Sequence, residues 1–121
     1  MKNALLLFAH GSRNPAWARE FETLRDEIKR LAPERMVALC YLELCEPNFA
    51  EGAQALIAQG ATDIEVVPLF FAPGKHTVED LPALVAEANA AHPQLRFVTR
   101  ATLLEDAHMR AAIANAALGK K

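Results

Sequence analysis

Four short segments rich in apolar residues are separated by longer segments in which apolar and polar residues recur with helical spacing. These segments cover residues 5–8, 36–42, 64–67 and 95–99, and the first two are continuously apolar, whereas Glu65 and Arg96 interrupt the other two. A continuous apolar run such as residues 5–8, followed by loop residues, is typical of a strand that is buried on both faces of a sheet. The pattern therefore predicts four strands, of which the first is buried on both faces.

The segments between and after these runs predict four helices, because their apolar residues recur every three or four positions. Proline near a helix start, a capping side chain before it and glycine after its end supply the boundaries. The expected helices run from Asn14 and Pro15 to Leu31, from Pro47 to a stop at Gly60, from a cap at Asp80 to the neighbourhood of His92, and from Leu104 to Leu118.

The alternation of strand and helix, four times over, predicts an α/β fold with a four-stranded parallel sheet. We expect the doubly wound strand order 2-1-3-4, with helices on both faces. Residues 1–121 would then form a single domain without a linker. In such sheets ligands bind beyond the carboxyl ends of the strands, where the winding direction reverses. The loops after the first and third strands are therefore the predicted site.

Composition narrows the class of protein. Of the 121 residues, 52% are hydrophobic and 23% charged, and the formal net charge is −2. This balance predicts a compact soluble protein without a basic surface for nucleic acid or an anionic membrane. The apolar N-terminal run is too short for a membrane span or for most signal-peptide cores, so we expect a cytoplasmic protein.

Cys40 and Cys45 lack CxxC spacing and are expected to be reduced and non-catalytic.

Two of the four histidines fall in the two loops of the predicted site. His10 follows the first strand and His76 follows the third. The predicted topology brings both imidazoles to one crevice, and imidazole is a common ligand of divalent cobalt, iron, nickel and zinc. We favour a shared metal ion over the alternative of two unconnected loop histidines. His92 and His108 are expected to be structural or solvent-facing.

Glu43 is the carboxylate nearest to this site. It follows the second strand, so it can reach the crevice as a metal ligand, a proton acceptor or a hydrogen-bond partner of an imidazole. An ordinary surface charge is an equal alternative. Glu46 and Glu79 are interpreted as surface charges. Asp80 is interpreted mainly as a helix cap, and a hydrogen bond from a site histidine to its carboxylate is the lesser alternative.

Arg13 and Lys75 lie beside the two candidate histidines and are the local cations for a ligand that carries carboxylates. Exposed loop charges are the alternative for both. Ser12 is expected in a loop or capping role, because no base is positioned to activate it as a nucleophile. Gly11 and Gly74 are expected to meet backbone demands, since a single His-Gly pair is not a phosphate-binding fingerprint.

Three motifs, each at the end of a predicted strand, together resemble a known family over most of the chain. They are Ala9-His10-Gly11-Ser12-Arg13, then Tyr41-Leu42-Glu43-Leu44 with Glu46-Pro47, then Pro68-Leu69-Phe70-Phe71 followed by Gly74-Lys75-His76 and Asp80-Leu81-Pro82. Each motif is weak alone, but their order is specific. The combination resembles the sirohydrochlorin chelatases of the CbiX/SirB type.

This resemblance implies insertion of a divalent metal, cobalt or ferrous iron, into sirohydrochlorin on the way to cobalamin or sirohaem. The sequence does not choose between these metals and nickel. No organic cofactor is implied, and the family's metal-binding histidines correspond to His10 and His76. Longer family members contain two related halves around one cleft. This chain resembles the short form, in which a symmetric homodimer supplies the second half.

The mechanism expected from the resemblance places the ion on His10 and His76 under a macrocycle. Leu69, Phe70 and Phe71 would form apolar walls, Arg13 and Lys75 would bind peripheral carboxylates, and a histidine or Glu43 would accept the pyrrole protons. A carrier of metal or tetrapyrrole that catalyses no insertion is the main alternative. Phosphoryl transfer through His10 ranks last, because histidine phosphatases have arginine where this chain has Ala9.

Overall fold

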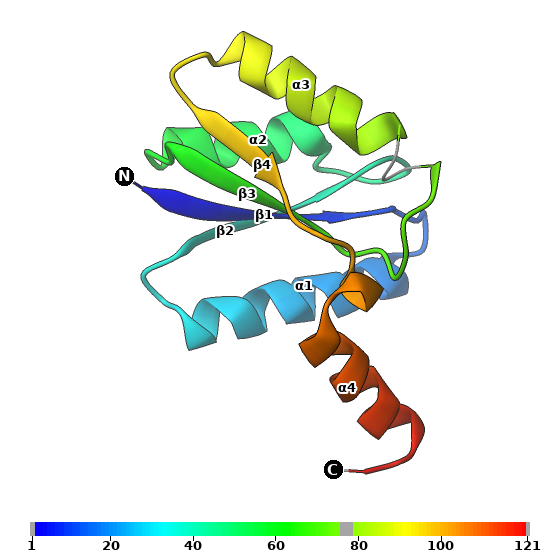
Figure 1. Cartoon of the computed structure of the whole chain (residues 1–121). Coiled ribbons are helices and arrows are strands. Elements are labelled where there is room, and N and C mark those ends of the chain that lie inside the picture. Colours follow the sequence, from blue (N-terminus) through cyan, green and yellow to red (C-terminus); the bar gives the residue numbers. More distant parts are fainter. Residues whose placement is uncertain (1, 76–78, 121) are drawn as a thin grey trace.

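The computed structural model describes residues 2–75 and 79–120, which form an α/β structure around one parallel sheet (Figure 1). The strand order is β2-β1-β3-β4, as the sequence predicts. The strands are β1 (Asn3–Ala9), β2 (Met36–Tyr41), β3 (Asp63–Pro68) and β4 (Arg96–Thr99). The helices are α1 (Pro15–Leu31), α2 (Phe49–Ala58), α3 (Leu81–Ala91), the short 3-10 helix η2 (Leu103–Glu105) and α4 (Ala107–Ala117).

Strand β1 is central and is paired along its length on both sides. Leu6 of β1 lies opposite Ala38 of β2 and Val66 of β3. Because neighbours flank β1 on both sides and helices cover both faces, every residue from Leu6 to Ala9 is buried. This burial explains why the strand appears in the sequence as a continuous apolar run rather than as an alternating one.

The two faces of the sheet carry separate cores. Helices α2 and α3 cover one face, where Phe8 packs between Phe49 and Phe70 with ring centroids 5.8 Å apart in both pairs. Helix α1 covers the other face, where Trp17 lies 5.8 Å from the ring of Tyr41. Figure 1 shows these two layers above and below the sheet. The prediction of helices on both faces is confirmed.

Helix caps show where local prediction succeeds and where it fails. The Oδ1 atom of Asn14 accepts a hydrogen bond from the backbone N–H of Ala16 at 3.0 Å and caps α1, as expected. Helix α2 begins two residues after Pro47, because Asn48 and Glu51 form a reciprocal capping box. The expected cap at Asp80 is wrong: its backbone is already helical, with φ −71° and ψ −49°, and its side chain makes no capping hydrogen bond.

The last predicted helix is shorter than expected. Leu104 belongs to η2, and α4 begins only after Asp106, whose backbone is extended. The Asp106 carboxylate accepts hydrogen bonds from the backbone N–H groups of His108 at 2.8 Å and Met109 at 3.3 Å. The extended residue therefore starts a new helix instead of continuing the 3-10 turn.

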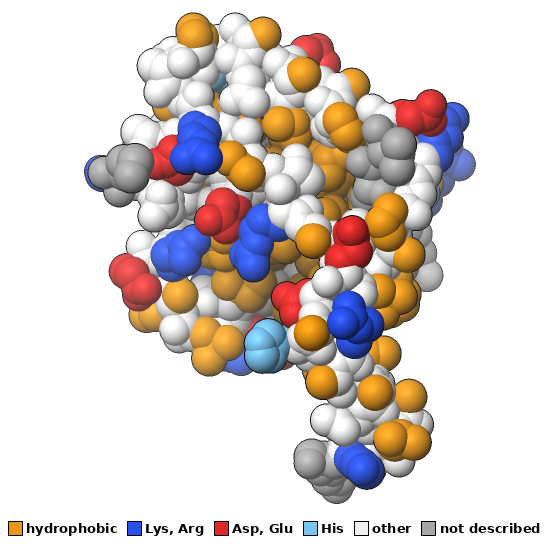
Figure 2. Space-filling model, in the orientation of Figure 1, with side chains coloured by type: hydrophobic (Ala, Val, Ile, Leu, Met, Phe, Trp, Pro, Cys, Tyr) orange, Lys and Arg blue, Asp and Glu red, His pale blue; other side chains and the backbone are white. Residues whose placement is uncertain are grey.

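Helix α4 points away from the sheet, and none of its residues is buried (Figure 1). Figure 2 shows hydrophobic side chains along this projecting helix. On the same side as α1, the sheet surface over β3 and β4 remains open, and Val98 there is 40% exposed. Within the described residues no helix is both long and apolar enough to cross a membrane.

Candidate functional site

The loops after β1, β2 and β3 begin side by side at the carboxyl edge of the sheet, on the right of Figure 1. Backbone hydrogen bonds continue past the strand ends. The N–H of Leu42 donates to the carbonyl of Ala9 at 2.9 Å, that of Glu43 to His10 at 3.1 Å, and that of Leu69 to Phe8 at 2.8 Å. These bonds hold the first residues of the three loops in register.

This register brings together the side chains of two predicted site residues, His10 and Glu43. The Nε2 atom of His10 lies 3.9 Å from Oε2 of Glu43. The two side chains are 42% and 53% exposed, so both are open to a ligand from solvent. An imidazole nitrogen and a carboxylate oxygen at this separation can both act as donors to a divalent cation.

The other ring nitrogen of His10 faces the protein. Nδ1 lies 3.2 Å from the backbone carbonyl oxygen of Gly11. In the tautomer that carries its proton on Nδ1, this N–H donates to the carbonyl and the lone pair of Nε2 points away from it. Such a bond from the second nitrogen is the usual way in which proteins orient a ligating histidine.

The separation of 3.9 Å is compatible with a shared ion. Nitrogen and oxygen ligands lie about 2.0–2.2 Å from a first-row divalent metal such as zinc, so two donors in a tetrahedral site are about 3.4 Å apart. The separation of His10 Nε2 and Glu43 Oε2 exceeds this value by about 0.5 Å. A small rotation of either exposed side chain would therefore bring both donors onto one ion.

Gly11 fixes the approach of the two loops. Its φ is +106°, and a β-carbon at this position would overlap the carbonyl oxygen of Glu43. A residue with a side chain does not fit between His10 and the loop that carries Glu43. The backbone at this position therefore requires glycine, as the sequence predicts.

His76 lies outside the described residues, so the structure does not address its predicted meeting with His10. In residues 2–75 and 79–120 there is no group of three or more His, Cys, Asp and Glu side chains that could hold a metal. His10 and Glu43 would need at least one further donor to complete such a site.

The remaining polar residues of the prediction lie around this edge. Arg13 and Lys75 are exposed, on the loops after β1 and β3. Ser12 has the predicted loop role, because its Oγ accepts a hydrogen bond from the N–H of Asn14 at 3.1 Å. Glu46 and Glu79 are exposed, consistent with surface charges. His92 ends α3 beside Phe97, and His108 is exposed in α4.

The three apolar residues after β3 differ in exposure. Leu69 packs against the core under α1, and Phe70 packs edge-on against Phe8 on the other face. Phe71 is 62% exposed. Of the three, Phe71 offers the most surface to a ligand above the sheet edge.

The two side chains that end β2 have shifted acidities. Burial raises the pKa of the Cys40 thiol far above its usual range, so this thiol stays protonated and unreactive. Burial, followed by the nearby Cys45, raises the pKa of Tyr41. Both cysteines are free thiols, as expected, and neither is part of the His10–Glu43 pair.

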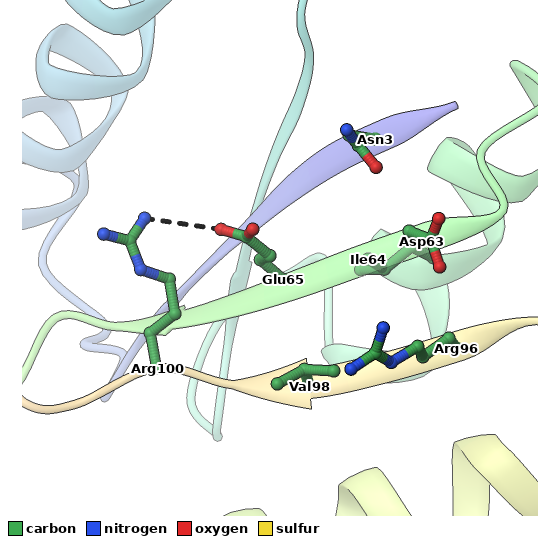
Figure 3. Close-up of a pocket in the computed structure, with 7 residues that line it drawn as sticks. All are labelled: Asn3, Asp63, Ile64, Glu65, Arg96, Val98 and Arg100. Carbon is green, nitrogen blue, oxygen red and sulfur yellow. Dashed lines mark hydrogen bonds and ion pairs between the residues drawn. The ribbon is translucent and has the colours of Figure 1, made fainter. Parts of the chain in front are cut away.

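A separate hollow lies on the open sheet face, away from this edge (Figure 3). Arg100 and Glu65 form an ion pair across it at 3.4 Å. Figure 2 shows basic and acidic side chains mixed in this region. The lining is charge-balanced, with two acidic and two basic side chains, and therefore offers no net charge to an ionic ligand. It consists of Asn3, Asp63, Ile64, Glu65, Arg96, Val98 and Arg100.

Comparison with known proteins places the chain in a family. The CbiX family model matches residues 4–118. A sirohydrochlorin cobaltochelatase from Sulfolobus acidocaldarius is 38% identical over 85 residues, which are 70% of this chain and 68% of that protein. A crystal structure of a CbiX protein from Marinobacter aquaeolei VT8 superposes with a TM-score of 0.83 at 27% identity, over 97% of this chain and 95% of the other.

Longer relatives match over part of their length. The sirohydrochlorin ferrochelatase of Bacillus subtilis is 32% identical over 80% of this chain, which spans 37% of that enzyme. The sirohydrochlorin chelatase SirB from Bacillus subtilis subspecies spizizenii, solved in complex with cobalt, has a TM-score of 0.76 and 33% identity over 82% of this chain and 42% of its own. The chain thus spans between about a third and two thirds of these curated relatives. With the family model matched over nearly all of its residues, the chain belongs to the CbiX family.

Proposed function

We propose that the protein is a sirohydrochlorin chelatase that inserts a divalent metal, cobalt or ferrous iron, into the macrocycle in cobalamin or sirohaem biosynthesis. Nickel is a further candidate, because imidazole and carboxylate donors do not discriminate strongly among these ions. The observation that carries the proposal is the convergence of His10 Nε2 and Glu43 Oε2 at the carboxyl edge of the sheet. The names of relatives that share the fold support it.

In this proposal His10 holds the incoming ion through Nε2. The carbonyl of Gly11 supports that role, since it can accept the Nδ1 proton and leave Nε2 unprotonated. His76 supplies the second imidazole from the loop after β3. Because β3 is the direct neighbour of β1, the ends of these two strands meet at one edge.

Insertion exchanges two protons for one cation. The ring enters with two pyrrole N–H groups, and its four nitrogens replace the protein donors around the ion while both protons leave. Glu43 lies next to His10 and is 53% exposed, so it can accept a proton and pass it to water. The same carboxylate can bind the hydrated ion before the ring arrives, which assigns it two successive roles.

Two kinds of contact would position the ring: ion pairs with the carboxylates on its rim and apolar contacts with its flat faces. Exposed Arg13 and Lys75 can bind its peripheral carboxylates from the loops after β1 and β3. Leu69, Phe70 and Phe71 follow the same β3 edge, and Phe71 presents the most apolar surface to the ring. No organic cofactor takes part in this scheme.

A second copy of the chain would complete the cleft as a symmetric homodimer. The chain spans less than half of its longer relatives, and α4 projects from the sheet, followed by Leu118, which is 70% exposed. Such a projecting apolar helix is a natural dimer contact. Each copy of residues 1–121 would act as one chelatase domain, in the cytoplasm, where free thiols such as Cys40 and Cys45 persist.

The insertion assay separates an enzyme from a carrier. Purified protein, Co²⁺ and sirohydrochlorin are mixed at pH 8, and the absorption spectrum of the ring is followed against a reaction without protein. We expect the protein to accelerate metallation and His10→Ala to lose at least 100-fold of the rate. Tight binding of ring or metal without acceleration would identify a carrier and overturn the proposal.

A matched substitution tests whether the loss is specific. His92→Ala removes a half-buried histidine that ends α3 directly before β4 begins, at the amino edge of the sheet, and should leave the insertion rate unchanged. The dimer is tested by light scattering after size exclusion. A mass of one chain at the concentration used in the assay would contradict the homodimer.

A further inference from the structure

Leu44 has a backbone conformation that is unfavourable for leucine. Its φ is +70°, and among residues 2–75 and 79–120 no other residue except glycine has a positive φ. The left-handed conformation crowds the β-carbon of an L-residue, a penalty that glycine avoids and asparagine tolerates better. A leucine at this position therefore weakens the fold unless its side chain gains something elsewhere.

Burial supplies little of that gain. The side chain of Leu44 is 47% exposed. Its neighbours behave differently, because Leu42 packs against the core under α2 and Cys45 packs against the core under α1. The segment thus directs Leu42 and Cys45 into the two cores and leaves Glu43 and Leu44 together at the surface. A strained backbone with an exposed apolar side chain points to function rather than stability.

The position of Leu44 relates it to the donor pair. It directly follows Glu43, whose backbone N–H is bonded to the carbonyl of His10. Since β1 lies between β2 and β3, the loop with Leu44 and the loop with Phe71 flank the loop with His10. The two loops that flank the loop of His10 therefore each carry an exposed apolar side chain, one leucine and one phenylalanine.

We propose that Leu44 is a substrate-binding residue that contacts the apolar face of the macrocycle on the β2 side of His10. This inference rests on the proposed function and deepens it. The ring has flat apolar faces and carboxylates on its rim, so an aliphatic side chain next to the donor pair removes part of a face from water. With Leu44 against a face of the ring, the adjoining Glu43 lies next to the pyrrole nitrogens at the ring centre and not next to the carboxylates on the rim.

The test is the substitution Leu44→Asn. Asparagine has almost the size of leucine and tolerates the left-handed backbone, but it removes the apolar surface. We expect a melting temperature equal to or above that of the wild type. We also expect the Kd for metal-free sirohydrochlorin, measured by quenching of ring fluorescence, to rise at least five-fold, while the Kd for Co²⁺ stays within two-fold.

Two matched variants complete the test. Leu44→Met keeps an apolar side chain and should restore most of the ring affinity. Leu31→Asn alters another exposed leucine, at the end of α1 on the opposite edge of the sheet, and should leave ring binding unchanged.

The outcomes distinguish this inference from the proposed function. If the wild type inserts cobalt and Leu44→Asn binds the ring within two-fold of it, the role of Leu44 is wrong and the proposed function stands. A lower melting temperature together with weakened Co²⁺ binding would show a structural role instead and would also overturn the inference. If the wild type binds no ring at all, both proposals fail.

Discussion

Gly11 faces the backbone carbonyl of Glu43 so closely that a β-carbon on it would overlap the carbonyl oxygen. The same two loops are joined by the hydrogen bond from the N–H of Glu43 to the carbonyl of His10. His10 and Glu43 can therefore lie close together only because Gly11, which faces the Glu43 loop, has no side chain.

Substituting Gly11 by alanine should separate the donor pair. The new methyl group must push the Glu43 loop away, and a φ of +106° is strained for alanine, at a cost of about 1–3 kcal/mol in the free energy of unfolding. We expect a Co²⁺ affinity at least ten-fold lower by calorimetric titration. Gly74→Ala is the control, because a β-carbon at Gly74 meets nothing within 4 Å. Equal Co²⁺ affinity in both variants would refute the role of Gly11.

Asn89 should be a stability residue. Its side-chain oxygen accepts a hydrogen bond from the N–H of Phe97 at 3.0 Å, and its Nδ2 donates to the carbonyl of Phe97 at 3.3 Å. These bonds join α3 to the edge strand β4. Asn89→Leu leaves the backbone N–H and carbonyl of the buried Phe97 without these side-chain partners. We expect the free energy of unfolding, measured by urea denaturation, to fall by about 1–3 kcal/mol.

The matched change for that measurement is Asn115→Leu on the projecting helix α4. It should alter stability by less than about 0.5 kcal/mol. A similar loss for both variants would show that the bridge between α3 and β4 contributes nothing specific.

The course of the chain was predictable from the sequence where the signals are local. Short segments rich in apolar residues identified the four strands, and Asn14 with Pro15 identified the start of α1. The strand order followed from the rules for parallel sheets, and with it the meeting of the loops that carry His10 and Glu43. These features depend on residue type and spacing alone.

The features that the sequence did not predict arise from contacts between distant segments or from backbone conformation. The overlap that excludes a side chain at Gly11 involves Glu43, more than thirty residues away. The left-handed backbone of Leu44 has no composition signal, because leucine rarely adopts it. Asp80 has the residue type of a cap but lies in helical backbone, whereas Asn48 and Glu51, three residues apart as a capping box requires, cap α2.

The two thiols should react very differently. Cys40 is fully buried and burial raises the pKa of its thiol, whereas Cys45 is partly exposed. We expect iodoacetamide at pH 8 to modify one thiol per native chain and two after unfolding, as measured by mass spectrometry. Cys45→Ser should abolish labelling of the native protein. Labelling of Cys40 at a comparable rate would contradict the packing of β2 under α2.

Acid should loosen the junction between η2 and α4. The side-chain and backbone hydrogen bonds from Thr102 hold the pKa of Glu105 below its usual range, and backbone N–H groups of Met109 and His108 do the same for Asp106. Because the folded pKa values are lowered, these contributions are present above the unfolded values of about 4.3 and 3.9 and are lost as pH falls below them. We expect the backbone amides of α4 to be the first to lose their protection from hydrogen exchange when the pH falls below about 4.

A variant connects this effect to its cause. Thr102→Val removes the hydroxyl that donates to Glu105 and keeps the shape of a buried side chain. The pKa of Glu105, followed by carboxyl NMR, should move back toward its usual range while that of Asp106 stays lowered. An unchanged Glu105 titration would show that the hydroxyl is not its main cause.

The proposed function requires that His10 Nε2 binds a divalent ion at the carboxyl edge of the sheet, with Glu43 and His76 as further donors before the ring arrives. Its most direct test is a crystal structure of the protein with Co²⁺, using anomalous scattering at the cobalt edge to place the ion. We predict a peak about 2.0–2.2 Å from both His10 Nε2 and Glu43 Oε2, with an imidazole of His76 as a further ligand. Cobalt bound elsewhere, with His10 Nε2 outside coordination distance of any ion, would contradict the account.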